Sequence, residues 1–230
     1  MNKIPRRLFS AWMGPAKMSL SRSAALESIV IHCGVPLNFV SYLNIQSWIH
    51  PDFPIHRVFP YLSAVHQCDY LRCYLLHVYG GGYTDIKHTQ HNWNVFFEKF
   101  EASDHQFGAG YTEIGPQGVA QVGGQLQIDM QNNFQKLIGV CSLIVKPDTK
   151  FTRLWFDSVN LTLDLHQDSI IQNPARHPQD HYGALFEGGE NSNYPLNWTG
   201  LGGDLLHPLI YEYSSDFLHL KMAPFFHDYR

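Results

Sequence analysis

Residues 64–87 read AVHQCDYLRCYLLHVYGGGYTDIK, and this stretch joins two local patterns across three consecutive glycines. Before the glycines, apolar residues recur at steps of three and four positions, which predicts an amphipathic helix over 64–79. Glycines 80–82 stop that helix, and 83–86 follows as a strand. Because glycine backbone freedom lets the chain turn at once from the helix into the strand, Asp85 is expected at a strand end close to the helix.

Two more polar residues lie on the predicted helix. Asp69 and Arg72 are three positions apart and share one face. With Tyr83 and Asp85 they could converge at the carboxyl end of a strand, where open α/β sheets bind ligands. Arg supplies a forked cation for a diphosphate, and Asp accepts hydrogen bonds from ribose or base. This set fits a nucleotide-sugar, although an Asp and Arg at this spacing also form ordinary solvated pairs, and spacing alone leaves both interpretations open.

The flanking sequence alternates between strand and helix patterns. Strands are predicted over 7–12, 34–40 (after a turn), 107–111 and 137–145, and helices over 23–33 and 151–165. Beyond residue 173, Gly-, Pro- and Asn-rich segments predict long surface loops. The alternation favours an α/β sheet in a single domain spanning 1–230.

Composition narrows the function classes. The 230 residues are 44% hydrophobic and 16% charged, which is typical of a folded globular chain. A formal net charge of −4 offers no basic face for nucleic acid. The four cysteines show no C-x-x-C spacing, which favours a reduced, cytoplasmic protein over a disulfide scaffold or a zinc site. No apolar run reaches the roughly 18 residues of a membrane helix, so no transmembrane segment is expected.

The segment 66–87 resembles the S-D-x-x-R…Y-G-G-x-Y-x-D-x-D signature of GT-A-type glycosyltransferases that carry a DXD motif. It is most similar to the capsular-polysaccharide-synthesis and mannosyltransferase-like group. Residues 4–12 resemble the I-P-K-x-I-x-x-x-W start of that group, and 173–180 and 194–199 resemble later segments. The resemblance implies a Rossmann-like mixed sheet with helices on both faces. It also implies a nucleotide-sugar-binding half over about 1–110 and an acceptor-side half over about 111–230.

The same resemblance implies a role for each matching residue. These roles are Ser10 and Trp12 for the base, Asp69 for ribose or base, Arg72 for the diphosphate, Tyr83 for the ribose or phosphate region, and Asp85 for a divalent Mn²⁺ or Mg²⁺ ion.

Lys87 departs from the pattern, because it stands where the family has its second metal-binding aspartate. An ammonium group cannot coordinate a hard cation that prefers oxygen ligands. Asp85 could still bind a metal with the diphosphate and waters, Lys87 could pair with the leaving diphosphate in place of part of the metal's charge, or the lysine could point away. We favour a divalent metal, because one carboxylate with diphosphate oxygens is a common arrangement for such ions.

Catalysis also needs a polar group on the acceptor side. Glu113, Asp180 and Asp204 qualify by type, and Asp180 is the first choice because it ends a polar stretch that includes His177. The expected function is transfer of a sugar from a UDP- or GDP-sugar to a glycan acceptor in polysaccharide or glycoprotein glycan synthesis, with retention of configuration. The alternative is a catalytically inactive nucleotide- or carbohydrate-binding module, in which Lys87 marks the loss of a metal site.

Overall fold

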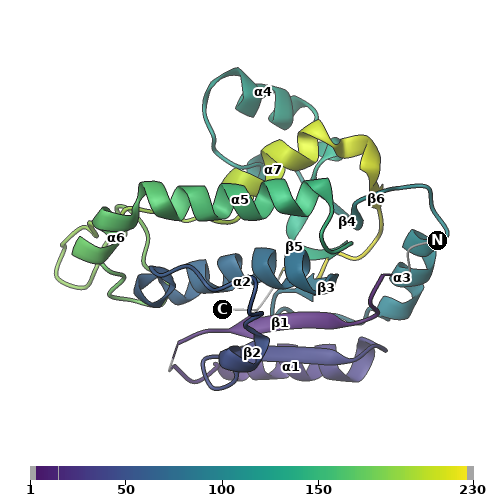
Figure 1. Ribbon diagram of the computed structural model, residues 1–230, viewed down its shortest axis with the longest axis horizontal. Helices are drawn as coiled ribbons and strands as arrows, with labels where there is room; N and C mark the ends of the chain where they lie inside the picture. The colour runs from purple at the N-terminus through teal and green to yellow at the C-terminus, as the bar shows by residue number, and fades with distance from the viewer. Residues whose placement is uncertain (1–3, 15, 227–230) are drawn as a thin grey trace.

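The computed structural model describes residues 4–14 and 16–226. These residues form a mixed sheet of six strands with helices packed against it (Figure 1). The strands are β1 (Leu8–Trp12), β2 (Leu37–Ser41), β3 (Gly81–Thr84), β4 (Gly108–Thr112), β5 (Ile138–Val145) and β6 (Phe217–His219), in the spatial order β2-β1-β3-β5-β4-β6. β1 is parallel to β2 and β3, β4 is parallel to β6, and β5 is antiparallel to both β3 and β4. Every strand except β5 therefore ends at the same edge of the sheet.

Helices cover both faces of this sheet. They are α1 (Leu20–His32), α2 (Ala64–Val78), α3 (Trp93–Glu101), α4 (Gly124–Asn132), α5 (Lys150–Leu165), α6 (Gln167–Gln172) and α7 (Gly203–Glu212). One apolar cluster joins α2, α5 and α7 to one face, and a second joins α1 and α3 to the other. In Figure 1, α4 lies at the outer end of the molecule, beyond α7. The predicted α/β domain is confirmed.

The helix predicted over 64–79 is confirmed as α2, and it is the most deeply buried helix of the fold. Ser63 caps its first turn by accepting a hydrogen bond from the His66 N–H. The helix packs between the sheet and α5, so its polar residues Asp69 and Arg72 are buried together with the apolar ones. A polar side chain in this position needs a partner inside the protein.

The three glycines after α2 have different roles, and the strand predicted over 83–86 begins two residues earlier, at Gly81. Gly80 leaves the helix with φ 63°, a left-handed conformation that suits glycine. Gly82 lies inside β3, where an added Cβ would come 2.6 Å from the Trp93 ring. The close approach of this tryptophan requires the glycine. Because β3 ends at Thr84, Asp85 is the first residue after the strand rather than part of it.

Most other predicted elements are confirmed within a few residues, namely β1, β2, β4, β5, α1 and α5. The prediction of loops beyond residue 173 is wrong for 203–219, which forms α7 and β6, and α3, α4 and α6 were not predicted. The implied boundary near residue 110 falls within β4, which pairs with both β5 and β6. Among the described residues, no helix combines the length and the apolar character needed to cross a bilayer.

Candidate functional site

The segment that follows β3 carries the centre of the candidate site. The Asp85 N–H donates to the Cys141 carbonyl at 2.8 Å, which keeps Asp85 beside β5. The Lys87 N–H donates to the Asp85 carbonyl at 2.8 Å. This tight turn brings the Lys87 ammonium back to Asp85, where Nζ lies 2.6 Å from Oδ2. The two side chains that the sequence places two positions apart therefore form an ion pair.

Arg72 joins α2 to this segment. Its Nη1 donates to Asp69 Oδ1 at 2.6 Å and its Nη2 donates to Asp85 Oδ1 at 2.8 Å. The guanidinium carbon lies 4.8 Å from the centre of the Tyr83 ring, within cation–π range. We call these five side chains (Asp69, Arg72, Tyr83, Asp85 and Lys87) the Arg72 cluster. The structure thus brings together five of the predicted site residues.

The charged groups of the Arg72 cluster shift one another's pKa values. Burial would raise the pKa of Asp85, but the Lys87 and Arg72 cations outweigh burial and hold this pKa below its ordinary value. Burial would lower the pKa of Lys87, and the Asp85 carboxylate raises it instead. For Asp69 burial dominates and raises the pKa, against the opposing effect of Arg72. Asp85 and Lys87 are therefore a charged pair at neutral pH.

Two further residues contact the Asp85–Lys87 segment. The Arg22 guanidinium, from the first turn of α1, donates to the Ile86 carbonyl. Lys87 Nζ also donates to the Cys141 sulfur at 3.1 Å, and burial raises the pKa of this thiol to about 11. Three cations thus surround the end of β3, against the two carboxylates of the Arg72 cluster.

The residues implied for the base lie at the end of β1. Ser10 is fully buried and donates to the Thr84 carbonyl at 2.9 Å, so its hydroxyl joins β1 to β3. Trp12 is half-buried and its indole N–H donates to the Ala16 carbonyl at 2.9 Å. Neither side chain lines the apolar groove that opens at this end of the sheet.

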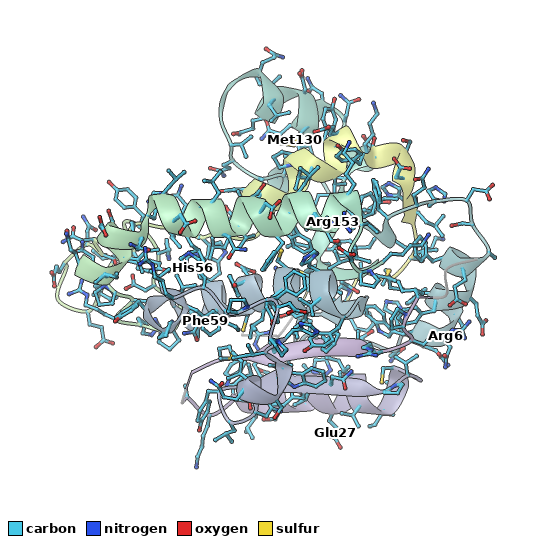
Figure 2. The ribbon with its side chains drawn as sticks, in the orientation of Figure 1. Arg6, Glu27, His56, Phe59, Met130 and Arg153 are labelled. Carbon is cyan, nitrogen blue, oxygen red and sulfur yellow. The ribbon has the colours of Figure 1, made fainter. Side chains whose placement is uncertain are left out.

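That groove has a volume of about 570 Å³ and opens beside the carboxyl ends of β1 and β2. Its walls are largely apolar, and Figure 2 labels two of the residues, His56 and Phe59. Met13 and Gly14 line it from β1, Tyr42 and Ile45 from the segment after β2, and Gln67 from α2. Such a surface suits a flat apolar ring with a few polar edges.

The fit of a divalent metal to Asp85 can be judged from its partners. Both carboxylate oxygens already accept charge-assisted hydrogen bonds, one from Arg72 and one from Lys87. Across the described ranges 4–14 and 16–226, no three His, Cys, Asp or Glu side chains are grouped to hold a metal ion. Hard divalent cations need several oxygen ligands, and a cation 2.6 Å from Oδ2 repels them. As arranged, these residues do not fit Mn²⁺ or Mg²⁺.

A second buried acid lies at the end of β4. Glu113 accepts a hydrogen bond from the Ile114 N–H at 2.8 Å, and burial raises the pKa of its carboxyl group. Its Oε2 lies 3.6 Å from Nε2 of His207 on α7. Burial lowers the pKa of His207 to about 4, so the imidazole is neutral at pH 7. Its Nδ1 accepts from the Ala120 N–H, which leaves the proton on the Nε2 that faces Glu113.

Asp180, the predicted catalytic acid, is buried in the loop that precedes α7. Its Oδ2 accepts from the Arg176 N–H at 2.9 Å, and its own N–H donates to the His177 carbonyl at 2.9 Å. These bonds close a turn. Asp180 Oδ1 is buried and has no hydrogen-bond partner among the described residues, as is also true of Asp204 Oδ1. Within the described part of the chain, the hydrogen bonds of Asp180 stay in its own loop and do not reach the Arg72 cluster, so its catalytic role stays a prediction.

The loop 173–202 nevertheless packs against the first turns of α2. His66 Nδ1 lies 3.1 Å from the Tyr194 hydroxyl, and His66 Nε2 lies 2.9 Å from the Asn197 carbonyl. A Cβ added to Gly202 would lie 3.2 Å from Asp69 Oδ2. The loop thus encloses Asp69, and sequence reasoning missed this because the partners are more than 120 positions apart.

Comparison with protein-family models and with curated proteins finds no match to this chain.

Proposed function

We propose that this protein is a GT-A-like glycosyltransferase that takes a sugar from a UDP- or GDP-sugar and adds it to a glycan acceptor. The observation that carries the proposal is the Arg72 cluster, in which α2 and the end of β3 present buried cations at the carboxyl edge of the sheet. Open α/β sheets bind phosphate-bearing ligands at this edge. A mixed sheet with helices on both faces is also compatible with the GT-A fold implied by the resemblance.

Two neighbouring surfaces match the parts of such a donor. The apolar groove beside β1 and β2 is large enough for a nucleoside, and Gln67 on α2 adds an amide edge that can hydrogen-bond a base. The groove and the Arg72 cluster lie at the same edge of the sheet, because β1, whose carboxyl end borders the groove, pairs with β3. We expect the diphosphate of a nucleotide bound in the groove to reach across the end of β1 to this cluster.

In the proposed reaction, the acceptor hydroxyl oxygen bonds to the anomeric carbon while the bond from that carbon to the diphosphate breaks. Retention of configuration, implied by the resemblance, is compatible with transfer of the hydroxyl proton to the departing diphosphate. The cations beside Asp85 would stabilise the negative charge that develops on this leaving group. Glu113 is suited to orient the acceptor hydroxyl, because it is a carboxyl group at the same edge of the sheet.

The experiment measures release of UDP or GDP from a panel of nucleotide-sugars, with and without oligosaccharide acceptors. Arg72→Lys keeps the charge but cannot bridge Asp69 and Asp85, and it is expected to lose about 100-fold in kcat/KM, in line with a misplaced charge-stabilising donor. Arg153→Lys, at an exposed pair on α5 (Figure 2), is the matched control and should retain full activity. A folded Arg72→Lys protein with wild-type turnover would contradict the proposal.

The second candidate, an inactive binding module, is favoured by one observation, namely that both oxygens of Asp85 are engaged by cations of the chain itself. The same panel separates the two candidates. Saturable binding of UDP or GDP in calorimetry, without turnover on any acceptor, would favour the module, whereas acceptor-dependent release of the nucleotide would exclude it.

A further inference from the structure

The negative charge of a bound diphosphate has to be balanced by cations that the site supplies. In the pattern that the chain resembles, a divalent ion held by two aspartates has this role, and Lys87 replaces the second aspartate. Asp85 and Lys87 instead form a buried ion pair at the place where that ion would be held.

We infer that Lys87 is the resident cation that binds the donor diphosphate, so that donor binding by this protein needs no divalent metal. The inference rests on the proposed function and adds the identity of the group that meets the phosphates.

Among the described residues, the carboxylate that follows β3 is already occupied by cations of the chain itself. Asp85 Oδ1 is 2.8 Å from Arg72 and Oδ2 is 2.6 Å from Lys87, so an incoming ion would have to displace one of these cations. Asp69 is no substitute, because its Oδ1 is bound by Arg72 at 2.6 Å. A hard divalent ion would therefore gain few oxygen ligands and would lie next to positive charges.

The Lys87 side chain is already held in place before a ligand binds. The ammonium group is held by Asp85 and by the Cys141 sulfur at 3.1 Å, and the residue is only 6% exposed. A flexible lysine loses side-chain entropy when it binds a ligand, but here that cost is already met in the fold. The Phe226 ring centre lies 5.8 Å from Nζ and limits the space around it.

The two side chains of the Asp85–Lys87 pair differ in their exposure to solvent. The Asp85 side chain is 22% exposed, against 8% for Lys87, so solvent reaches the pair from the Asp85 side. A phosphate oxygen arriving from that side can replace Oδ2 as the acceptor of the Lys87 N–H. One charge-assisted hydrogen bond is exchanged for another, and the ammonium group never becomes unpaired.

The test is calorimetric titration of the wild-type protein with UDP and GDP, in EDTA and in excess Mn²⁺, with UMP and GMP as probes that lack the second phosphate. We expect the affinity for the diphosphates to agree within about threefold between the two conditions. Lys87→Met should weaken diphosphate binding about 10- to 100-fold, as for loss of one charged hydrogen bond, and leave monophosphate binding nearly unchanged.

Lys87→Arg keeps the charge and is the matched control, and circular dichroism establishes that each variant is folded. If Lys87→Met does not fold, the comparison of EDTA with Mn²⁺ on the wild-type protein still decides the metal question. Binding that appears only with Mn²⁺, or a folded Lys87→Met protein with wild-type diphosphate affinity, overturns the inference and leaves the proposed function standing. Failure of every nucleotide to bind in either condition removes the proposed function as well.

Discussion

Asp85, which is partly buried, and Glu113, which is buried, are carboxyl groups in corresponding positions, each directly after a strand that pairs with β5, yet their surroundings differ. Asp85 is bound by two cations, and its pKa is held below the ordinary value despite burial. Glu113 has a single backbone N–H donor and faces a neutral imidazole, so burial raises its pKa.

The difference shows that burial alone does not decide the charge of a carboxyl group. Burial disfavours ionisation at both positions, and only Asp85 has enough positive charge nearby to reverse the effect. A permanently charged carboxylate can hold cations in place, whereas a carboxyl group with a raised pKa is better suited to exchange a proton. The two ends of β3 and β4 are therefore equipped for different tasks.

The largest expected effect comes from removing the cation that Asp85 shares with Asp69. Arg72→Ala leaves two buried carboxylates without their common partner, and breaking a buried pair in this way costs about 3–5 kcal/mol. Urea denaturation should show this loss in the free energy of unfolding. The matched control is Arg153→Ala, whose pair with Asp148 is exposed and should contribute at most about 1 kcal/mol. Equal losses in the two variants would refute the contrast between a buried and an exposed pair.

The second prediction concerns the neutral partner of Glu113. The pKa of His207 is about 4 in the folded protein, and about 6.5 is usual for an unfolded chain. Between these values the unfolded state binds a proton that the folded state refuses, so this residue makes stability fall as the pH drops from 6.5 to 4, by about 3 kcal/mol in all.

His207→Asn retains an acceptor for the Ala120 N–H and removes the titrating ring. The free energy of unfolding, measured at intervals between pH 4 and 6.5, should therefore depend less steeply on pH in the variant. His32→Asn, at an exposed position on α1, is the control and should keep the wild-type slope. An unchanged slope in His207→Asn would mean that the imidazole is not held neutral by burial.

The smallest effect is expected from a substitution that displaces the Glu113 side chain. A Cβ added to Gly118 would overlap Glu113 Oε1, so Gly118→Ala should turn the carboxylate away at a cost of about 1 kcal/mol for an altered rotamer. NMR titration of the Glu113 side chain should then give a lower pKa than in the wild type, because the group gains solvent. The control is Gly202→Ala, whose added Cβ contacts Asp69 instead, and this variant should leave the pKa of Glu113 unchanged.

Sequence reasoning recovered the part of the fold that depends on local pattern. α2 has a clear three-and-four periodicity and a serine cap, and β5 is a nearly continuous apolar run, so both were predicted within a residue. The Arg72 cluster could be anticipated because its members lie within 69–87, on a helix and a strand joined by glycines. Because these residues are close together in the sequence, local patterns were enough to predict that their side chains meet.

The remainder depends on distant partners. β6 is three residues long and exists as a strand because it pairs with β4, more than 100 positions earlier. α7 begins at a glycine and contains Pro208, two signals that argue against a helix. The proximity of Glu113 and His207 arises only when α7 packs near the end of β4, so no local pattern could have indicated it.

The insertion of β5 between β3 and β4 has a consequence for how the polypeptide is made. When synthesis has reached residue 112, β3 and β4 have been made, but β5, the strand that lies between them and pairs with both, has not, because it spans residues 138–145. Until that partner leaves the ribosome, β3 keeps one unpaired edge, of the kind that recruits other chains. A fragment cut near residue 110 should therefore aggregate when expressed alone, and its yield should recover upon co-expression with the complementary piece.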